Sequence, residues 1–432
     1  MKKSAFLPAD ILIPKNQDFS KWSVVACDQF TSDNVYWEDV EKIVGTNPST
    51  FRISLPEIFL EHDDIVNRIN NINETMENYI KNDIFSVIKN SYIYIERQIG
   101  ENKIRKGLIG IFDLDEYDFS IKSASLIRPT EGTVLDRIPP RVKIRENALL
   151  EMPHIMILID DREKNIIENI SDQKADLEKV YDFNLMKNGG HITGWQISSK
   201  NAEKIVDSLE KLGNIDEFNK KYNVSDKPLL MYAVGDGNHS LATAKTCWEN
   251  IKKTLSEDEQ KVHPAKYALA ELVNLHDSSL EFEAIHRVLF KVNPQNILNE
   301  LKKYYKNVQI LVENEKINTS EKAHIFQAVI NKDKYNIVIE NPEKNLCVDT
   351  LQQFLDYYIN NFGGKIDYIH GDDVVMALSE ESPENMGFIL PVMHKNELFK
   401  TVILDGVLPR KTFSMGHAHE KRYYLETRII KK

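Results

Sequence analysis

Short apolar runs alternate with segments of helical periodicity along most of the chain. Apolar residues return at helical spacing over Asn34–Val44, His62–Lys89 and Leu241–Trp248. Runs of strand length occur at residues 11–14, 22–30, 51–56, 107–113, 154–159, 229–234, 267–275 and 284–290. Because both kinds of segment interleave, the pattern predicts an α/β protein of the α+β kind with mixed sheets.

Changes in texture along the chain predict four parts. Residues 1–180 are expected to form an N-terminal α/β region with an arginine-rich loop, and residues 181–290 a core around the turn described below. Residues 291–375 are rich in Lys, Asn and Glu and run helix, strand, strand, helix, which predicts a small α+β accessory lobe. Residues 376–432 return to the core pattern.

Composition narrows the class of protein. The chain has 432 residues and a net charge of −11, which argues against a protein that binds a nucleic-acid backbone. No apolar stretch approaches the roughly 20 residues of a membrane span, and the N-terminus lacks the apolar run of a signal peptide. Cys27, Cys247 and Cys347 lie far apart and are expected to be free thiols. We therefore expect a cytoplasmic protein without a membrane partner.

The segment 229–245, LLMYAVGDGNHSLATAK, reads as a strand, a polar turn and a helix. Such a turn leaves backbone N–H groups unpaired at a helix N-terminus, a geometry that suits phosphate. Asp236 and His239 add side chains able to hold a metal or move a proton. The alternative is a turn in which Asp236 and Asn238 merely cap the helix. The turn consists of Gly235, Asp236, Gly237, Asn238, His239 and Ser240.

An arginine-rich segment over residues 126–150 is a second candidate. Arg128, Arg137 and Arg141 carry forked guanidinium groups that suit phosphate oxygens, and Glu131 could accept a proton from a hydroxyl nucleophile. Its prolines and β-branched residues favour a defined extended loop. The alternative is a solvated basic loop.

The C-terminal segment LPRKTFSMGHAHEKRYY, residues 408–424, combines a lysine, hydroxyl groups and a glycine, as an anion cradle does. A metal site at His417 and His419 with Glu420 or Glu426 is an alternative, and a plain surface loop is another. His286 and Arg287 near a strand are further ligand candidates. The cradle would use Lys411, Thr412, Ser414 and His417.

Four motifs in order resemble the bacterial family DUF1015, over almost the whole chain. GDGNHSLATA at residues 235–244 is similar to the family's ADGHHRYETA. The other three matches comprise Thr130, Glu131, Thr133, Asp136 and Arg137; Leu272, Val273, Asn274, Asp277, Leu280, His286 and Arg287; and Leu408, Pro409, Lys411, Thr412 and Phe413. Asn238, Ser240 and Thr130 stand where the family has His, Arg and His.

The turn also resembles that of the ParB/sulfiredoxin superfamily, which includes free-serine kinases. This resemblance implies a ParB/serine-kinase-like core that phosphorylates L-serine with pyrophosphate or a nucleotide, assisted by Mg²⁺. Asp236 would bind Mg²⁺ or orient the acceptor, Glu131 would be the general base and His239 would support the transferring group. Residues 235–240 and 411–416 would hold the donor, with Thr133 nearby. Arg137 and Arg141 would neutralise its charge.

Two alternatives belong to other classes. One is a ParB-like nucleotide-binding regulator without turnover, and the other is a phosphomonoester hydrolase that uses water in the same cradle. An assay for phosphoserine formation separates the kinase from both.

Overall fold

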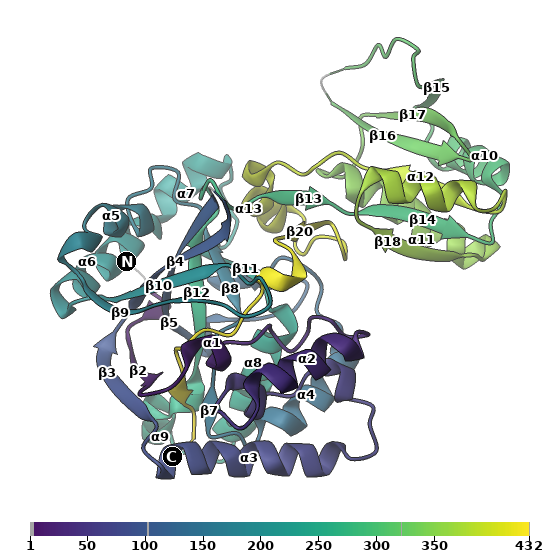
Figure 1. The fold of residues 1–432 in the computed structure, drawn as a ribbon. Coiled ribbons are helices and arrows are strands. Elements are labelled where there is room, and N and C mark those ends of the chain that lie inside the picture. The colour runs from purple at the N-terminus through teal and green to yellow at the C-terminus, as the bar shows by residue number, and fades with distance from the viewer. Residues whose placement is uncertain (1–3, 102, 321, 432) are drawn as a thin grey trace. The chain divides into compact units, whose positions relative to one another are not determined.

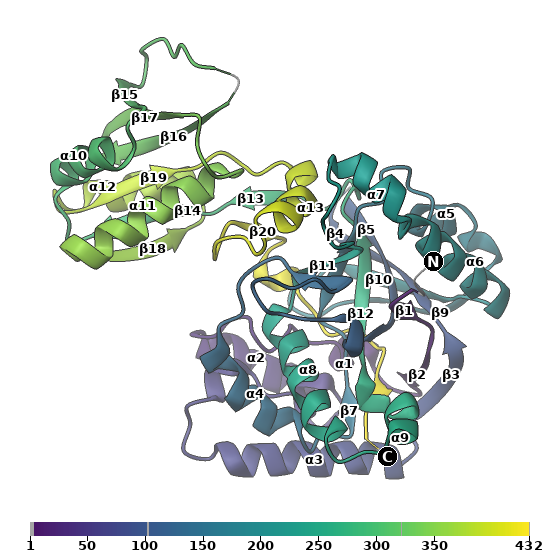
Figure 2. The same cartoon turned by 180° about the vertical axis from the view of Figure 1, so that it is seen from behind.

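The computed structural model describes residues 4–101, 103–320 and 322–431. The chain divides into two compact units, shown in Figures 1 and 2. Unit 1 comprises Met1–Leu280 and Gly416–Lys432, and unit 2 comprises Glu281–Met415. Each unit is described separately.

Within the described residues, unit 1 is built on a mixed sheet of nine strands in the order β6-β11-β8-β12-β5-β4-β10-β9, with β1 beside β5. β11 runs parallel to β6, and β12 runs parallel to β8. The strands are β1 Phe6–Leu7, β4 Ile93–Gly100, β5 Lys103–Asp113, β6 Ile127–Pro129, β8 Met156–Ile159, β9 Glu178–Asn184, β10 His191–Gln196, β11 Tyr232–Asp236 and β12 Tyr267–Asn274.

Both faces of this sheet are buried, because alternate residues of its central strands enter two different cores. Leu108 and Phe112 of β5 pack in one core with α6 and α8, while Ile109 and Ile111 pack in the other with α3. This explains why the central strands are almost continuously apolar. The helices of unit 1 are α1 Phe19–Trp22, α2 Asn34–Val44, α3 Ile65–Lys81, α4 Ile138–Arg145, α5 Ile167–Asp172, α6 Ser199–Leu212, α7 Ile215–Tyr222, α8 Asn238–Lys252 and α9 Glu257–Val262.

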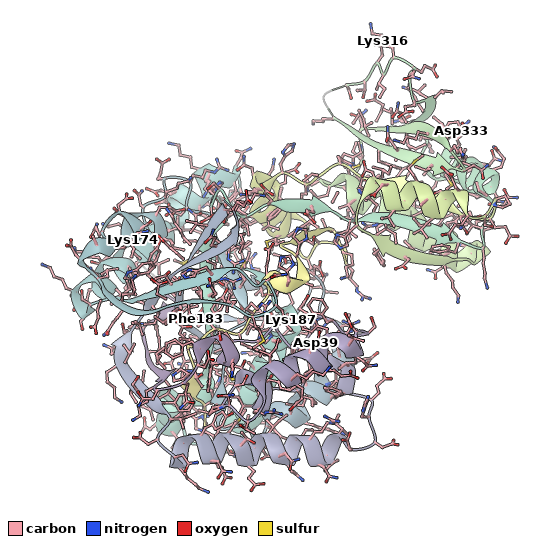
Figure 3. All side chains as sticks on the ribbon, viewed as in Figure 1. Asp39, Lys174, Phe183, Lys187, Lys316 and Asp333 are labelled. Carbon is pink, nitrogen blue, oxygen red and sulfur yellow. The ribbon has the colours of Figure 1, made fainter. Side chains whose placement is uncertain are left out.

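Two short sheets and several single turns complete unit 1. The sheets pair β2 Ala9–Pro14 with β3 Phe85–Ser91, and β7 Leu150–Glu151 with β21 Arg428–Ile429. The 3₁₀ turns are η1 Thr50–Arg52, η2 Glu57–Phe59, η3 Leu114–Glu116, η4 Leu135–Arg137, η5 Lys174–Asp176, η6 Pro264–Lys266 and η7 Ala418–Glu420. Lys187 follows β9, and its Nζ lies 2.9 Å from Asp39 Oδ2 of α2 (Figure 3). This ion pair connects α2 to the loop after β9.

Unit 2 contains an antiparallel sheet in the order β15-β17-β16-β19-β14-β18 and a separate pair of β13 with β20. Its strands are β13 Phe282–Ala284, β14 His286–Phe290, β15 Val308–Val312, β16 Ala323–Ile330, β17 Asp333–Glu340, β18 Lys365–Ile369, β19 Met386–Ile389 and β20 Phe413–Met415. Its helices are α10 Pro294–Tyr304, α11 Cys347–Phe362, α12 Asp372–Glu380 and α13 Lys395–Leu404.

The mixed α/β class is confirmed, and four local expectations are wrong. The run 22–30 forms no strand, since Trp22 ends α1 and only Val25 makes an isolated bridge, to Arg422. The helix predicted over 62–89 ends at Lys81, because Asp83 adopts a left-handed φ of 53° and β3 follows. The arginine-rich segment is not extended throughout, since α4 forms with prolines in its first turn, where they fit a helix. Thr50–Arg52 forms a 3₁₀ turn capped by Ser49 instead of a strand.

The four predicted parts differ from the two units. A boundary at residue 180 would cut β9, which belongs to the same sheet as β4. The second unit begins at Glu281 instead of 291, and it ends at Met415 instead of 375, because β14 and β19 pair within one sheet. Among the described residues the three cysteines are free, and no helix has the length and apolar character needed to cross a membrane.

Candidate functional site

The GDGNHS turn joins β11 to α8 at one edge of the large sheet. Gly237 is the N-cap of α8 and has a φ of 78°, a conformation that favours glycine. A Cβ atom at Gly237 would lie 3.0 Å from the backbone of Ile155, so the position is also too close for a side chain. Asp236 Oδ1 accepts the Gly237 N–H at 2.9 Å. The N-cap itself therefore has no side chain that could accept from the first amides of the 15-residue helix.

Lys421 forms an ion pair with Asp236 at this turn. Lys421 Nζ lies 3.0 Å from Asp236 Oδ2, and each side chain is 25% exposed. Burial alone would lower the pKa of Lys421, but the nearby carboxylates of Asp236, Asp28 and Glu131 raise it. The lysine is therefore a permanent cation at the N-terminal end of α8.

The backbone of the C-terminal segment places Lys421 beside Asp28. The Lys421 carbonyl accepts the Ala26 N–H at 2.8 Å, and the Tyr423 N–H donates to the Val24 carbonyl at 3.0 Å. Burial alone would raise the pKa of Asp28, but His154, the Gln29 amide and Lys421 hold it below its usual value. Asp28 is therefore a carboxylate beside the ammonium.

Glu131 reaches the same edge because β6 runs parallel to β11, so both strands end there. Thr130 Oγ1 donates to the Val234 carbonyl at 2.7 Å and ties the start of the loop to β11. Farther along, His239 Nε2 accepts the Val134 N–H at 3.3 Å. In a neutral His239 ring the proton is therefore on Nδ1.

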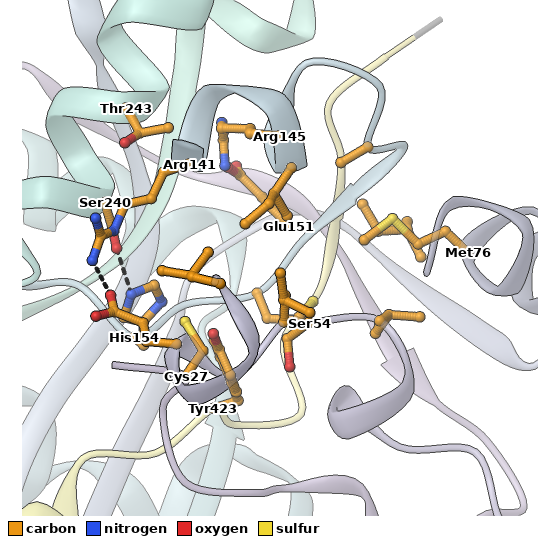
Figure 4. A pocket seen from close by; sticks show the side chains of 18 residues that line it. Cys27, Ser54, Met76, Arg141, Arg145, Glu151, His154, Ser240, Thr243 and Tyr423 are labelled. Carbon is orange, nitrogen blue, oxygen red and sulfur yellow. Dashed lines mark hydrogen bonds and ion pairs between the residues drawn. The ribbon is translucent and has the colours of Figure 1, made fainter. Parts of the chain in front are cut away.

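His154 and Ser240 form a polar pair next to this group (Figure 4). His154 precedes β8, whose Met156 is opposite Asp236, and its Nε2 lies 2.7 Å from Ser240 Oγ. The imidazole also packs edge-on against the Tyr423 ring, with 5.1 Å between ring centres. The hydrogen bond between Ser240 and His154 thus connects the turn to the segment that precedes β8.

Three buried polar atoms around the turn have no hydrogen-bond partner among the described residues. They are Thr133 Oγ1, His154 Nδ1 and Asn238 Oδ1. Buried polar atoms are seldom left unpaired, and a bound water, ion or ligand is one explanation for those that are. The turn therefore offers hydrogen-bonding capacity that the protein itself does not use.

The predicted arginine ligands lie in different surroundings. Arg128 is buried, its guanidinium donates to the carbonyls of Ser125, Pro228 and Leu229, and burial lowers its pKa to about 10. Arg141 forms an ion pair with Glu57, and Arg137 is exposed. Their contact with phosphate remains a prediction, and Arg128 already uses three donor contacts within the protein.

Most of the predicted C-terminal cradle belongs to unit 2, together with the His286–Arg287 pair. Thr412 Oγ1 donates to the Pro409 carbonyl at 2.7 Å, His286 Nε2 lies 2.8 Å from Asp372, and the fully buried Arg287 donates to Gln352. Lys411 and Ser414 also belong to unit 2, whereas His417 lies in unit 1. Whether these residues join the turn remains a prediction.

The candidate metal ligands contact other groups of the protein. The described part of the chain contains no group of three or more His, Cys, Asp or Glu side chains placed to hold a metal ion. His417 and His419 stack with ring centres 5.6 Å apart, while Glu426 is buried and accepts from Tyr181. Asp236 contacts the Gly237 amide and Lys421 with its two oxygens. Its Mg²⁺ ligation remains a prediction.

Comparison with known proteins identifies the family. The family model described as "Protein of unknown function (DUF1015)" matches residues 7–358. The chain belongs to this family. The fourth motif of this DUF1015 protein, at residues 408–413, lies beyond the matched range. No curated protein matches the chain.

Solved structures similar to this DUF1015 protein share little of its sequence. A free serine kinase in complex with AMP is 11% identical, with a TM-score of 0.38, over 77% of this chain and 95% of that chain. A conserved hypothetical protein from Pyrococcus furiosus is 11% identical, with a TM-score of 0.36, over 74% and 94%. SbnI from Staphylococcus aureus is 9% identical, with a TM-score of 0.35, over 71% and 82%. Likeness at this level leaves the activity to be argued from the site.

Lys421 and His154 of this DUF1015 protein were not singled out by the sequence. Lys421 sits in a run of charged residues that looks like surface, and His154 begins an apolar strand. A partial signal existed, because the C-terminal segment already contained candidate ligands. The pairing that carries Lys421 to Asp28 joins segments almost 400 residues apart, which no local pattern reveals.

Proposed function

We propose that unit 1 transfers a phosphoryl group to the hydroxyl group of a small molecule at the GDGNHS turn. The observation that carries the proposal is the meeting of Asp236, Glu131 and Lys421 at the N-terminal end of α8. A helix N-terminus and an ammonium group together suit the negative oxygens of a phosphoryl donor. Phosphoryl transfer depends mostly on such positioning and charge neutralisation.

The proposed reaction needs one base and one group of cationic or N–H donors. Glu131 takes the proton of the acceptor hydroxyl as its oxygen bonds to phosphorus, and the bond from phosphorus to the donor's bridging oxygen breaks. The departing phosphate keeps that electron pair, and Lys421 and the first amides of α8 stabilise the charge. Asp236 holds Lys421 in place through the 3.0 Å ion pair. His239 lies in the same turn and is assigned to the transferring group.

We propose L-serine as the acceptor and pyrophosphate or a nucleotide as the donor, with Mg²⁺ accompanying the donor. The motif resemblance supports serine. The site supports an amino acid in one further respect, because Asp28 and Asp236 are carboxylates that can pair with an ammonium group. Mg²⁺ is often bound by one or two carboxylates together with substrate phosphates, which is a requirement that a single Asp can meet.

The decisive experiment incubates the full chain with L-serine, MgCl₂ and either pyrophosphate, ADP or ATP, and follows phosphoserine by ³¹P NMR. We expect Glu131→Gln to reduce kcat by about 100-fold or more with little change in KM, because the base acts in the transition state. Glu146→Gln, an exposed residue at the end of α4, is the matched control and is expected to retain full turnover.

Each other outcome has a definite meaning. Wild-type turnover of Glu131→Gln would exclude Glu131 as the base. Absence of phosphoserine with every donor, while a nucleotide still binds, would favour a regulator without turnover. Release of phosphate from phosphoserine without a donor would favour a phosphomonoester hydrolase.

A further inference from the structure

Unit 1 contains a cavity of about 140 Å³ behind the start of α8, shown in Figure 4. Its lining residues come from the loops before and after η1, from α3, α4 and α8, and from the C-terminal segment. The cavity is partly open to solvent, as small-molecule sites in proteins commonly are. A cavity that so many separate segments enclose therefore suggests a ligand.

One end of the cavity is polar. Cys27, His154, Ser240 and Tyr423 line it, and His154 Nε2 lies 2.7 Å from Ser240 Oγ. The other imidazole nitrogen, His154 Nδ1, is buried without a hydrogen-bond partner among the described residues. This end can therefore donate to and accept from a neutral polar group.

The rest of the cavity is apolar, and its charged residues are paired with one another. Arg141 pairs with Glu57, and Arg145 shares Glu151 with Arg428. A charged ligand would have to displace a carboxylate or a guanidinium group from an existing ion pair, which disfavours it relative to a neutral ligand. The apolar lining includes Ile53, Leu55, Leu60, Met76, Ile144 and Met152.

We infer that this cavity binds an uncharged small molecule whose apolar group is about the size of a benzene ring and whose hydroxyl or amide group meets Ser240 and His154. An engineered apolar cavity of roughly 150 Å³ accepts benzene, which sets the size of the group. Ser240 belongs both to the GDGNHS turn and to the cavity, so the ligand contacts the turn from the side of the cavity. The binding site stands whether or not the turn transfers phosphoryl groups.

Methyl NMR with benzyl alcohol as the probe tests this site in the full chain. Met76 and Met152 line the cavity, whereas Met393 belongs to unit 2 and serves as an internal control. With ¹³C-methyl methionine labelling, we expect benzyl alcohol to shift the Met76 and Met152 signals saturably and to leave Met393 unchanged. Benzoate, of the same size but charged, is expected to shift neither.

Absence of a saturable shift at Met76 and Met152, or an equal response to benzoate, would overturn the inference. Because this measurement involves no phosphoryl donor, its failure is distinguishable from failure of the proposed kinase reaction.

Two variants test the two ends of the cavity separately. Ala148→Leu adds volume to the lining, so we expect it to abolish the shifts while a cooperative thermal transition shows that the protein still folds. Ser240→Ala removes the polar contact, and we expect it to weaken benzyl alcohol about fivefold and to leave toluene unchanged, as for loss of one neutral hydrogen bond. Equal weakening of both probes by Ser240→Ala would contradict the assigned polar end, even if Ala148→Leu did not fold.

Discussion

Two ion pairs in unit 1 have the same chemistry and opposite surroundings. Arg105 on β5 and Glu271 on β12 lie 3.2 Å apart, with side chains only 7% and 5% exposed. Lys421 and Asp236 lie 3.0 Å apart, each 25% exposed. The first pair sits within the large sheet, and the second sits at its edge, beside the N-terminus of a helix.

The side chains of the buried pair share a third partner, Tyr424. Tyr424 accepts from Arg105 at 2.7 Å and donates to Glu271 at 2.8 Å, so the three side chains satisfy one another. Gly107 leaves room for this arrangement, because a Cβ there would lie 2.4 Å from Glu271 Oε1. Arg105 and Glu271 thus have their partners within the sheet, next to the buried Arg97, which lies opposite Arg105 on β4.

At the edge pair, by contrast, Lys421 is shared. Asp236, Asp28 and Glu131 all act on the same ammonium, and water reaches it. The comparison teaches that matched, buried charges serve the fold, whereas shared and accessible charges remain available to a ligand. Substitutions at Arg105, Glu426 and Lys421 test this difference, from the largest expected effect to the smallest.

Arg105→Met should cause the largest change. Removal of one partner leaves the Glu271 carboxylate buried without its cation, and we expect unfolding to become easier by about 3–5 kcal/mol. Urea denaturation followed by fluorescence measures this. The double variant Arg105→Met/Glu271→Met should recover most of the loss, because no charge is left unpaired. A loss below about 1 kcal/mol in the single variant would show that the pair is not structurally important.

Glu426 is another buried ionisable residue of unit 1, and it makes the stability of the fold depend on pH. Its carboxylate accepts the Tyr181 hydroxyl at 2.6 Å, and burial raises its pKa from 4.5 to about 7. The folded state therefore holds a proton that the unfolded state releases, so stability is full below pH 4.5 and falls as the pH rises toward 7. At about 1.4 kcal/mol for each pKa unit, the contribution of this group is about 3 kcal/mol.

Thermal denaturation between pH 4.5 and 8 measures the Glu426 effect. Glu426→Gln stays neutral, so its stability should lose this part of the pH dependence while other groups still contribute. Identical pH profiles for the two proteins would show that Glu426 titrates normally in the folded state.

Lys421→Met should separate activity from stability. We expect phosphoryl transfer to fall by about 30-fold or more, equivalent to about 2 kcal/mol, because the charge-neutralising cation is lost. Stability should change by only about 1 kcal/mol, since both partners of the ion pair are partly solvated. Lys421→Arg keeps the charge and should retain more activity. A large loss of stability with unchanged turnover would place Lys421 with the structural pairs.

The sequence predicted those features that depend on neighbouring residues. The GDGNHS turn is contiguous, so its strand, glycine and helix were all visible, and Asn34–Val44 matches α2. Glu131 is also part of a contiguous motif, although the strand β6 that ends just before it was not predicted. Lys421 and His154 could not be found in this way, because a C-terminal segment pairing with residues 24–26 brings Lys421 to Asp28.

The domain boundaries failed for a similar reason. β14 and β19 are separated by almost 100 residues and pair in one sheet, while the textures of their segments suggested different parts of the molecule. The helix α4 differs from the extended loop that its prolines predict, because the first turn of a helix tolerates proline.

The contacts of Arg128 fix the position of β6 relative to the segment that leads into β11. Its guanidinium fastens β6 to the carbonyls of Pro228 and Leu229, just ahead of β11, and to Ser125 on its own approach. Any sliding of one strand past the other would break several of these bonds at once. The ends of β6 and β11 therefore stay level with each other, which fixes the position of Glu131 relative to Asp236.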